Sequence, residues 1–327
     1  MKSNLTLLLM FVALLVAEPA AAQSDDWAAE GTFSIIARDT ATGELGMAVQ
    51  SKAFATGSRA MSIKGGVAVI AHQSQSNPMY GALGIDLLSR GMSPQQALDM
   101  MLRSDEGRDS RQVSILDATG RTAAFTGTGA ADWKGHHCGR DFCAQGNILV
   151  GPAVVEAMVQ AFGSSTGPLA ERMLAALDAG QAAGGDARGT QAAALVVAKP
   201  LAAAGFGDRV IDLRVDDSRA PLVELRRLLN MFRSRQLVSE ANARLGAGNV
   251  PEAAQIALRA RELSPEFDEA WVIWAVTQLR SGRKAEALEG LRKAVQLNPA
   301  NKRWLLRNRN LQPLLEDPEF KKIIGNP

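Results

Sequence analysis

The last third of the chain repeats itself with a period of 34 residues, and this feature constrains the fold more than any other. Seven positions in residues 245–265 hold the same residue type 34 positions later. They are Leu245, Gly248, Glu252, Ala253, Ala260, Leu263 and Pro265, followed by Leu279, Gly282, Glu286, Ala287, Ala294, Leu297 and Pro299. Small residues let paired helices approach closely, and each proline ends a unit. The period is typical of stacked helix pairs, so we predict that residues 235–327 are entirely helical.

This repeat resembles the tetratricopeptide repeat, which implies a surface for a protein partner. Residues 311–324 have the pattern of a capping helix pair. Two copies are fewer than the roughly three that usually make a stable array. We therefore expect this region to pack on residues 219–240, on the preceding domain or on another chain.

The N-terminus has the pattern of a cleavable signal peptide. Lys2 precedes an apolar run, Leu5–Ala17, and the small residues at 20–22 suit a signal peptidase. The run is shorter than the ~20 residues that span a bilayer, although an uncleaved anchor helix remains the alternative. We predict a signal peptide at 1–22, a mature chain from Gln23, and a periplasmic or secreted protein that does not span the membrane.

Export affects how the two cysteines are interpreted. Cys138 and Cys143 are five positions apart, and in an oxidising compartment such a pair closes a small disulfide loop. His136 and His137 precede Cys138, so a Cys/His metal cluster is the alternative, but a metal site needs more ligands. We predict a disulfide, and neither a metal nor another cofactor.

The charge distribution argues against a nucleic-acid partner. Residues 1–230 carry 20 basic and 23 acidic residues (20 − 23 = −3), and residues 231–327 carry 16 and 11 (16 − 11 = +5). This excess is small, and it is better explained by solvated helix faces than by a binding surface.

The front of the chain mixes strands and helices in an irregular order. We expect strands at 32–37, 45–51, 66–71, 113–117, 121–126, 191–197 and 210–215, and helices at 94–103, 152–162 and 168–178. Ser93, Pro94 and Gln96 form a helix start with a capping box. This order favours an α+β domain with antiparallel or mixed sheets and segregated helices. We place the domain at 32–230, after a short extension at 23–31.

Three segments could carry chemistry, because phosphate-binding loops, dinucleotide fingerprints, zinc-protease helices and nucleophile elbows are absent from the sequence. The first is Gly31-Thr32, at the start of the first strand. A threonine can be a nucleophile when its own α-amine is free to act as the base, which requires a cut before Thr32. The alternative is an ordinary threonine that opens a strand.

The second segment is 71–81, where polar residues follow a buried strand. Polar side chains at a strand end often line a pocket, so His72, Gln73 and Asn77 are candidates for substrate binding. The alternative is a plain loop with a helix cap at Asn77.

The third segment is 180–191, which is rich in glycine and contains one charge of each sign. Glycines free the backbone to present N–H groups, Arg188 suits a substrate carboxylate, and Asp186 suits an ammonium group. The alternative is a structural crossing loop with an internal Asp–Arg pair.

Several blocks of residues 32–230 resemble the domain-of-unknown-function family 1028. The blocks are Thr32–Asp39, Gly43–Ser51, Gln145–Leu149, Ala179–Gly189 and Val210–Asp217. That family is similar to the N-terminal-nucleophile hydrolase superfamily, which implies a four-layer αββα sandwich with Thr32 as the catalytic nucleophile. If the protein is such a hydrolase, we expect Gln145 and Asn147 to bind the substrate and backbone N–H groups near Asn147 or Gly184-Gly185 to hold the oxyanion.

The sequence departs from the superfamily pattern in two ways. Signal cleavage leaves nine residues, 23–31, ahead of Thr32, so a second cut is required. Threonine hydrolases of the proteasome type add a lysine and an aspartate; Lys64 lies near the expected distance, but its flanking residues match poorly.

Two functions follow from these observations. The first is an exported amide-bond hydrolase that acts on a small amide or peptide and carries a C-terminal protein-interaction repeat. The second is a non-catalytic extracytoplasmic binding or scaffold protein built on the same fold. The N-terminus of the mature protein distinguishes them.

Overall fold

The computed structural model describes residues 31–130, 132–200 and 207–325. The predicted signal peptide and residues 23–30 of the extension lie outside this part of the chain. Within it, no helix is both long and apolar enough to cross a membrane.

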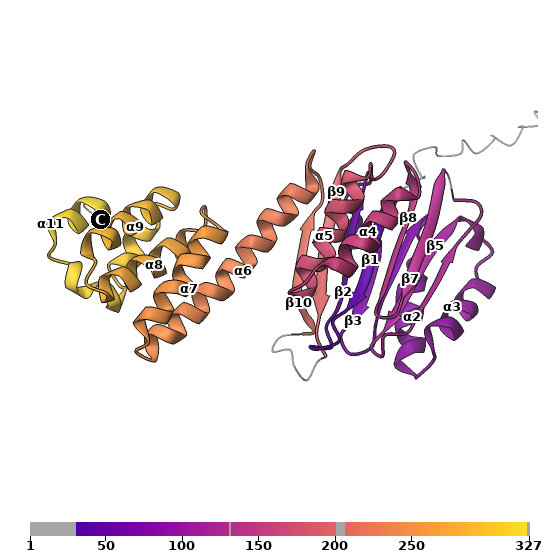
Figure 1. Cartoon of the computed structure of the whole chain (residues 1–327), viewed down its shortest axis with the longest axis horizontal. Coiled ribbons are helices and arrows are strands. Elements are labelled where there is room, and N and C mark those ends of the chain that lie inside the picture. The colour runs from indigo at the N-terminus through magenta and orange to yellow at the C-terminus, as the bar shows by residue number, and fades with distance from the viewer. Residues whose placement is uncertain (1–30, 131, 201–206, 326–327) are drawn as a thin grey trace, which may run out of the picture.

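A six-stranded antiparallel sheet is the centre of the front domain (Figure 1). Its strands lie in the order β10-β9-β2-β1-β8-β7. Their bounds are β1 Thr32–Arg38, β2 Leu45–Ser51, β7 Trp133–Gly139, β8 Phe142–Leu149, β9 Ala192–Ala198 and β10 Arg209–Val215. The central strand β1 pairs Thr32 with Ser51 on one side and with Asn147 on the other.

A second antiparallel sheet has four strands in the order β3-β4-β5-β6. Their bounds are β3 Met61–Lys64, β4 Ala68–Ser74, β5 Arg111–Asp117 and β6 Thr122–Thr126. The register of β4 and β5 sets Gln73 opposite Gln112. A short helix, α1 Thr56–Arg59, connects the two sheets, and a 3-10 turn, Arg108–Ser110, precedes β5.

Helices cover the outer faces of the two sheets, and the inner faces pack on each other. Helices α4 Ala153–Ser164 and α5 Leu169–Ala182 share a core with the six-stranded sheet. Helices α2 Met79–Ser89 and α3 Pro94–Arg103 share another core with the four-stranded sheet. A third apolar cluster, which includes Ile36, Val69 and Leu116, lies between the sheets. The α+β class with two antiparallel sheets is therefore confirmed.

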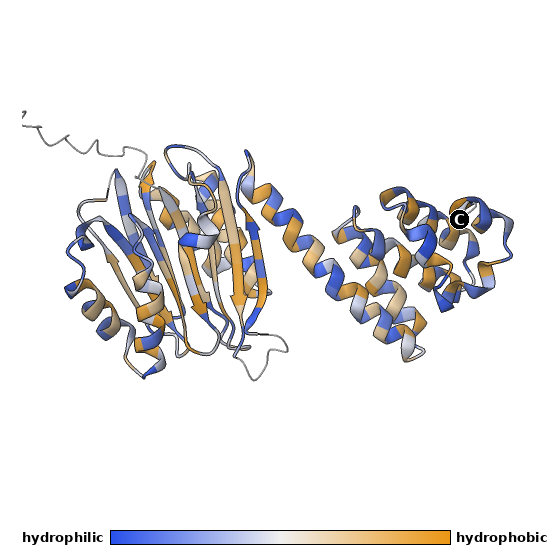
Figure 2. Cartoon of the chain, turned by 180° about the vertical axis from the view of Figure 1, so that it is seen from behind, coloured by the Kyte–Doolittle hydropathy of each residue, from blue (hydrophilic) through white to orange (hydrophobic). Residues whose placement is uncertain are grey.

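The C-terminal region is helical, as predicted, and a single long helix leads into it (Figure 1). Its elements are α6 Pro221–Gly246, α7 Val250–Leu263, α8 Asp268–Arg280, α9 Lys284–Leu297, α10 Asn301–Leu305, the 3-10 helix Arg309–Leu314 and α11 Pro318–Ile324. The repeated alanines at 253, 260, 287 and 294 are all fully buried. Figure 2 shows hydrophobic and hydrophilic residues alternating along α6, whereas the strands of the sheets are mostly hydrophobic.

Two local features that were predicted from specific residue types are present in the structure. Ser93 and Gln96 form the expected capping box of α3. Cys138 and Cys143 are joined in a disulfide across the β7–β8 hairpin, at paired positions of its register.

Candidate functional site

The inner face of β1 is polar at its N-terminal end and apolar further on. Side chains alternate along a strand, so Phe33 and Ile35 enter the core under the helices, whereas Ile36 enters the cluster between the sheets. Thr32 and Ser34 share the face of Ile36 and are buried, with 2% of Thr32 exposed. The site begins from these two hydroxyl groups.

Amide side chains from three strands meet them. The Gln73 amide donates to the Thr32 carbonyl oxygen (3.0 Å) and to Gln112 Oε1 (2.8 Å), and Ser34 Oγ donates to Gln73 Oε1 (2.7 Å). Asn147 Nδ2 also donates to Gln112 Oε1 (3.0 Å). We call this group, completed by Ser114 and Gln145, the polar cluster.

Part of the polar cluster has unused hydrogen-bonding capacity. Among the described residues, none pairs with either amide atom of Gln145, with Asn147 Oδ1 or with Ser114 Oγ, although all are buried. A buried polar group left without a partner costs about 1–3 kcal/mol. Four such atoms meet in this one cluster, and a concentration of unpaired polar atoms is typical of a binding site.

The peptide bond between Gly31 and Thr32 is held by two hydrogen-bond donors on its carbonyl oxygen. Ser51 Oγ and Arg188 Nη2 both donate to Gly31 O, the latter over 2.9 Å. Thr32 Oγ1 donates to the same Ser51 Oγ (3.0 Å). We call Ser51 and Arg188 the carbonyl clamp, since they meet at this oxygen.

Asp186 fixes the orientation of Arg188. Its carboxylate accepts from the Arg188 backbone N–H (2.9 Å), from Arg188 Nη2 (2.8 Å) and from the Lys52 backbone N–H (3.0 Å). A Cβ atom on Gly31 would lie 2.8 Å from Asp186 and 2.9 Å from Arg188, so only glycine fits before Thr32 without displacing this pair. The Asp186 side chain is fully buried, whereas 30% of the Arg188 side chain reaches solvent.

A basic cavity of about 530 Å³ lies beside the carbonyl clamp. Arg188 contributes to both, and Lys52 and Arg59 add two further positive charges to the cavity wall. Phe54 also lines the cavity and is 62% exposed, which gives it an apolar surface. Such a cavity suits a small anionic molecule with an apolar part.

The chain is similar to other proteins over its front domain. A family model described as a family of unknown function, DUF1028, matches residues 32–225. The chain belongs to this family. A crystal structure of a protein from Silicibacter pomeroyi, described as a DUF1028 protein, is 30% identical to the chain, with a TM-score of 0.55. That similarity covers 61% of this chain and 88% of the other. No curated protein matches the chain.

The DUF1028 domain brings most of the predicted site residues together. Gln73 contacts Thr32 directly, and Gln112 links Gln73 to Asn147. Gln145 lies opposite Ser34 in the pairing of β8 with β1. Arg188, which Asp186 holds, contacts the carbonyl oxygen of Gly31. The Asp186 carboxylate forms its hydrogen bonds within the protein, as the crossing-loop alternative expects. Arg188 is therefore the member of the Asp186–Arg188 pair that reaches the basic cavity. The functional roles of these residues stay predictions.

His72 and Asn77 lie away from Thr32. His72 precedes Gln73 on β4, so it faces the helices, where Ser76 Oγ lies 2.8 Å from Nδ1 and Ser62 Oγ lies 3.2 Å from Nε2. Burial lowers the pKa of His72 to about 4, so the ring is neutral near pH 7. It lines a second cavity of about 600 Å³, together with Arg111 and with Arg59, which also lines the basic cavity. Asn77 Oδ1 accepts from the Met79 backbone N–H at the start of α2.

The DUF1028 domain also contains site residues that sequence reasoning missed. Ser51, Gln112 and Ser114 enter the site from β2 and β5, and Ser34 follows Thr32 on β1. A polar residue on an otherwise apolar strand was the available signal, and Ser34 and Ser51 stand in blocks that carry the family resemblance. Lys64 is exposed on β3, where its Nζ donates to Ser89 Oγ (3.3 Å).

Proposed function

We propose that this DUF1028 protein is an exported amide-bond hydrolase of the N-terminal-nucleophile type, with Thr32 as the nucleophile. Maturation is a cut between Gly31 and Thr32 inside an αββα sandwich. The observation that carries the proposal is the carbonyl clamp, because it places two donors where an oxyanion would form on the bond that must break. The predicted signal peptide and the disulfide support an extracytoplasmic location.

The maturation cut uses atoms that already lie together. Thr32 Oγ1 attacks the Gly31 carbonyl carbon, and the negative charge that develops on the oxygen is stabilised by Arg188 and Ser51. The bond from this carbon to the Thr32 nitrogen breaks, and the proton of the Thr32 hydroxyl, which Ser51 Oγ accepts in a hydrogen bond, ends on that nitrogen. Water then hydrolyses the resulting ester, which leaves a carboxylate on Gly31 and an α-amine on Thr32.

Turnover repeats this chemistry on a substrate. The free α-amine of Thr32 has an ordinary pKa of about 8, so it accepts the hydroxyl proton near neutral pH without a histidine. Thr32 Oγ1 attacks the substrate carbonyl, the amine portion leaves with the proton, and water releases the acyl group. The unpaired amide groups of Gln145 and Asn147 suit an amide-containing substrate.

The basic cavity indicates the substrate class. The Lys52 ammonium on the cavity wall favours a carboxylate, and Phe54 favours an apolar group beside it. We therefore infer a small amide or short peptide that carries a free carboxylate. Removal of residues 23–31 is needed for access as well as for chemistry, because Thr32 is buried while Gly31 is attached.

A panel of paired substrates tests this function. N-acyl amino acids and their methyl esters differ only in the carboxylate, and the account expects mature protein to cleave the acids faster by about tenfold. Thr32→Ala should abolish cleavage of both, and Thr32→Ser should retain part of it. Equal cleavage by the folded Thr32→Ala variant would rule out Thr32 as the nucleophile.

The second candidate is a binding or scaffold protein that keeps residues 23–31. The burial of Thr32 favours it, since an uncut chain offers no accessible nucleophile. In that case the carbonyl clamp is a structural anchor for the start of β1, and all substrates of the panel stay intact.

A further inference from the structure

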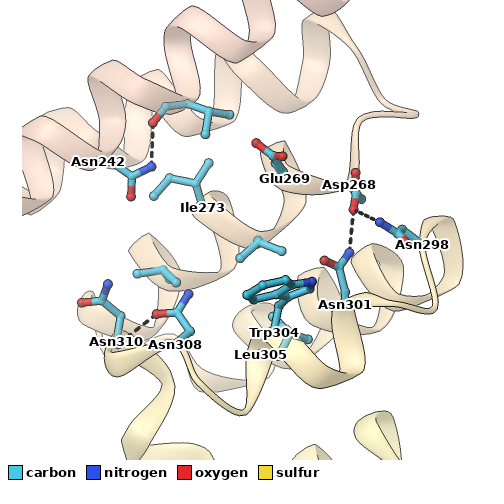
Figure 3. A pocket seen from close by; sticks show the side chains of 13 residues that line it. Asn242, Asp268, Glu269, Ile273, Asn298, Asn301, Trp304, Leu305, Asn308 and Asn310 are labelled. Atoms are coloured by element: carbon cyan, nitrogen blue, oxygen red, sulfur yellow. Dashed lines mark hydrogen bonds between the residues drawn. The ribbon is translucent and has the colours of Figure 1, made fainter.

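A groove of about 450 Å³ opens in the C-terminal helical region, far along the chain from Thr32 (Figure 3). Side chains from α6, α8 and α10 line it, together with the segments on both sides of α10. Val238 on α6 and Val272 on α8 both line the groove and are one 34-residue period apart. The repeat therefore builds the groove from equivalent helix positions.

We propose that this groove binds an extended segment of a partner protein that presents a lysine or arginine next to an apolar side chain. This inference is independent of the Thr32 chemistry.

The charge of the groove favours a cationic ligand. Asp268 and Glu269 line it, and no lysine or arginine is among its described lining residues. Asn298 Nδ2 (2.8 Å) and Asn301 Nδ2 (2.7 Å) hold the Asp268 carboxylate in place. Glu269 is exposed and forms no hydrogen bond or ion pair within the described chain, so its carboxylate is available to a ligand.

An aromatic surface lies beside this charge. Trp304 lines the groove and is 66% exposed, and Figure 3 shows its ring between Asn301 and Asn308, across the groove from Glu269. Arg307 lies over this ring, with its guanidinium carbon 6.0 Å from the ring centroid, so the exposed indole is left mainly to pack against apolar side chains of a ligand. Val272 and Ile273 extend the apolar part of the wall.

The asparagines match the polar backbone of an extended peptide. Asn242 uses Nδ2 to donate to the Val238 carbonyl oxygen (3.0 Å), and Asn308 uses Oδ1 to accept from the Asn310 backbone N–H (3.0 Å). Within the described chain, Asn242 Oδ1 and Asn308 Nδ2 form no hydrogen bond, so one acceptor and one donor are left for a ligand. A peptide group needs both kinds of partner.

Peptide binding by the whole mature protein tests the proposal. The probes are fluorescein-labelled ten-residue peptides of alternating leucine and arginine, with a matched set in which glutamate replaces arginine. Glu269→Gln should weaken binding of the basic set by about fivefold, as for an exposed ion pair. Trp304→Ala should weaken it by about tenfold. Glu262→Gln, an exposed carboxylate on α7, is the control and should change nothing.

The basic set should bind more tightly than the acidic set, and added salt should reduce the difference. Equal binding of both sets, or equal effects of Glu269→Gln and Glu262→Gln, would overturn the proposal. Sedimentation analysis tests whether a second copy of the chain occupies the groove instead. If the wild-type protein is a dimer and Trp304→Ala makes it dissociate, the groove is a dimer interface, and the proposal of a basic partner segment is contradicted.

Discussion

Ser51 occupies a central place at the residue scale, because its hydroxyl group contacts both groups that would react in the proposed maturation cut. It accepts from Thr32 Oγ1 and donates to the Gly31 carbonyl oxygen. Arg188 supplies the second donor, and Asp186 prevents its guanidinium group from turning away. In the proposed mechanism, Thr32 is the nucleophile, Ser51 and Arg188 form the oxyanion site, and Asp186 positions Arg188.

Removal of either donor of the carbonyl clamp should slow the maturation cut. Loss of one oxyanion donor typically costs 100-fold or more in rate, so Ser51→Ala and Arg188→Gln should each slow conversion by about that factor. Arg90→Gln, at an exposed arginine after α2, is the matched control. A mass-spectrometric time course of the chain from Gln23 measures the cut, and an unchanged rate in both clamp variants would contradict the assignment.

His72 should make the protein sensitive to mild acid. Its pKa is about 4 in the folded state because burial disfavours the charged ring, against about 6.5 when unfolded. Between these values the unfolded chain binds the extra proton, so the free energy of unfolding falls as pH falls. Urea unfolding at pH 7 and pH 4.5 should show wild type losing about 2–3 kcal/mol more than His72→Gln. Equal losses would show that His72 titrates normally.

At the scale of elements, the sequence predicted strands and helices well where local chemistry defines them. The bounds of β2 and α3 agree fully, and those of β1 agree to within one residue, because each combines a regular apolar period with turn or capping residues. The sequence predicted no helix at α2 and only a possible helix cap at Asn77, because Gly81 and Gly84 lower the helix propensity of this segment. Both glycines are required by packing: a Cβ on Gly84 would lie 2.5 Å from Ile70.

The β7–β8 hairpin was missed for a related reason. Residues 133–139 of β7 form an edge strand whose side chains are largely half-buried or exposed, so the strand lacks an apolar pattern.

The residues of the site were predictable only in part. Thr32, Asn147 and Arg188 stand in the sequence blocks that carry the family resemblance. Gln112 stands in none of these blocks, and it joins the site through hydrogen bonds between the two sheets. Which of His72 and Gln73 faces Thr32 depends on the orientation of β4, which the sequence does not specify.

The disulfide should contribute modestly to the stability of this hairpin. A loop closed by residues five apart removes little chain entropy on unfolding, so its loss should lower the free energy of unfolding by about 2 kcal/mol. Cys138→Ser with Cys143→Ala is the suitable variant, since Cys143 is buried between the sheets. Guanidinium unfolding of both proteins without reductant gives the difference, and wild type with two titratable thiols in its native state would contradict the bond.

At the scale of the whole molecule, α6 belongs to both parts of the chain. Leu222, Leu225 and Leu229 are in the core under the six-stranded sheet, whereas Val238 and Leu245 are in the core of the helical region. Glu171 on α5 pairs with Arg226 and Arg233 along the first half of the helix. The predicted boundary at 230–235 therefore falls inside a continuous helix, between two separate cores.

A truncation after residue 234 should separate the two proposed activities. It retains the leucines of α6 that pack on the sheet, so the front domain should fold and keep its turnover of small amides. It removes the groove, so binding of the leucine–arginine peptides should be lost. Circular dichroism confirms folding of the truncated chain, and a folded truncation without turnover would show that the helical region takes part in catalysis.

The position of the first residue of active protein is the most direct test of the account. Intact-mass analysis of mature protein, purified from the compartment to which it is exported, distinguishes a chain that starts at Gln23 from one that starts at Thr32. The account predicts that the species starting at Thr32 carries all the amidase activity, and that Thr32→Ala remains uncut. Active protein that retains residues 23–31 in full would contradict the N-terminal-nucleophile mechanism.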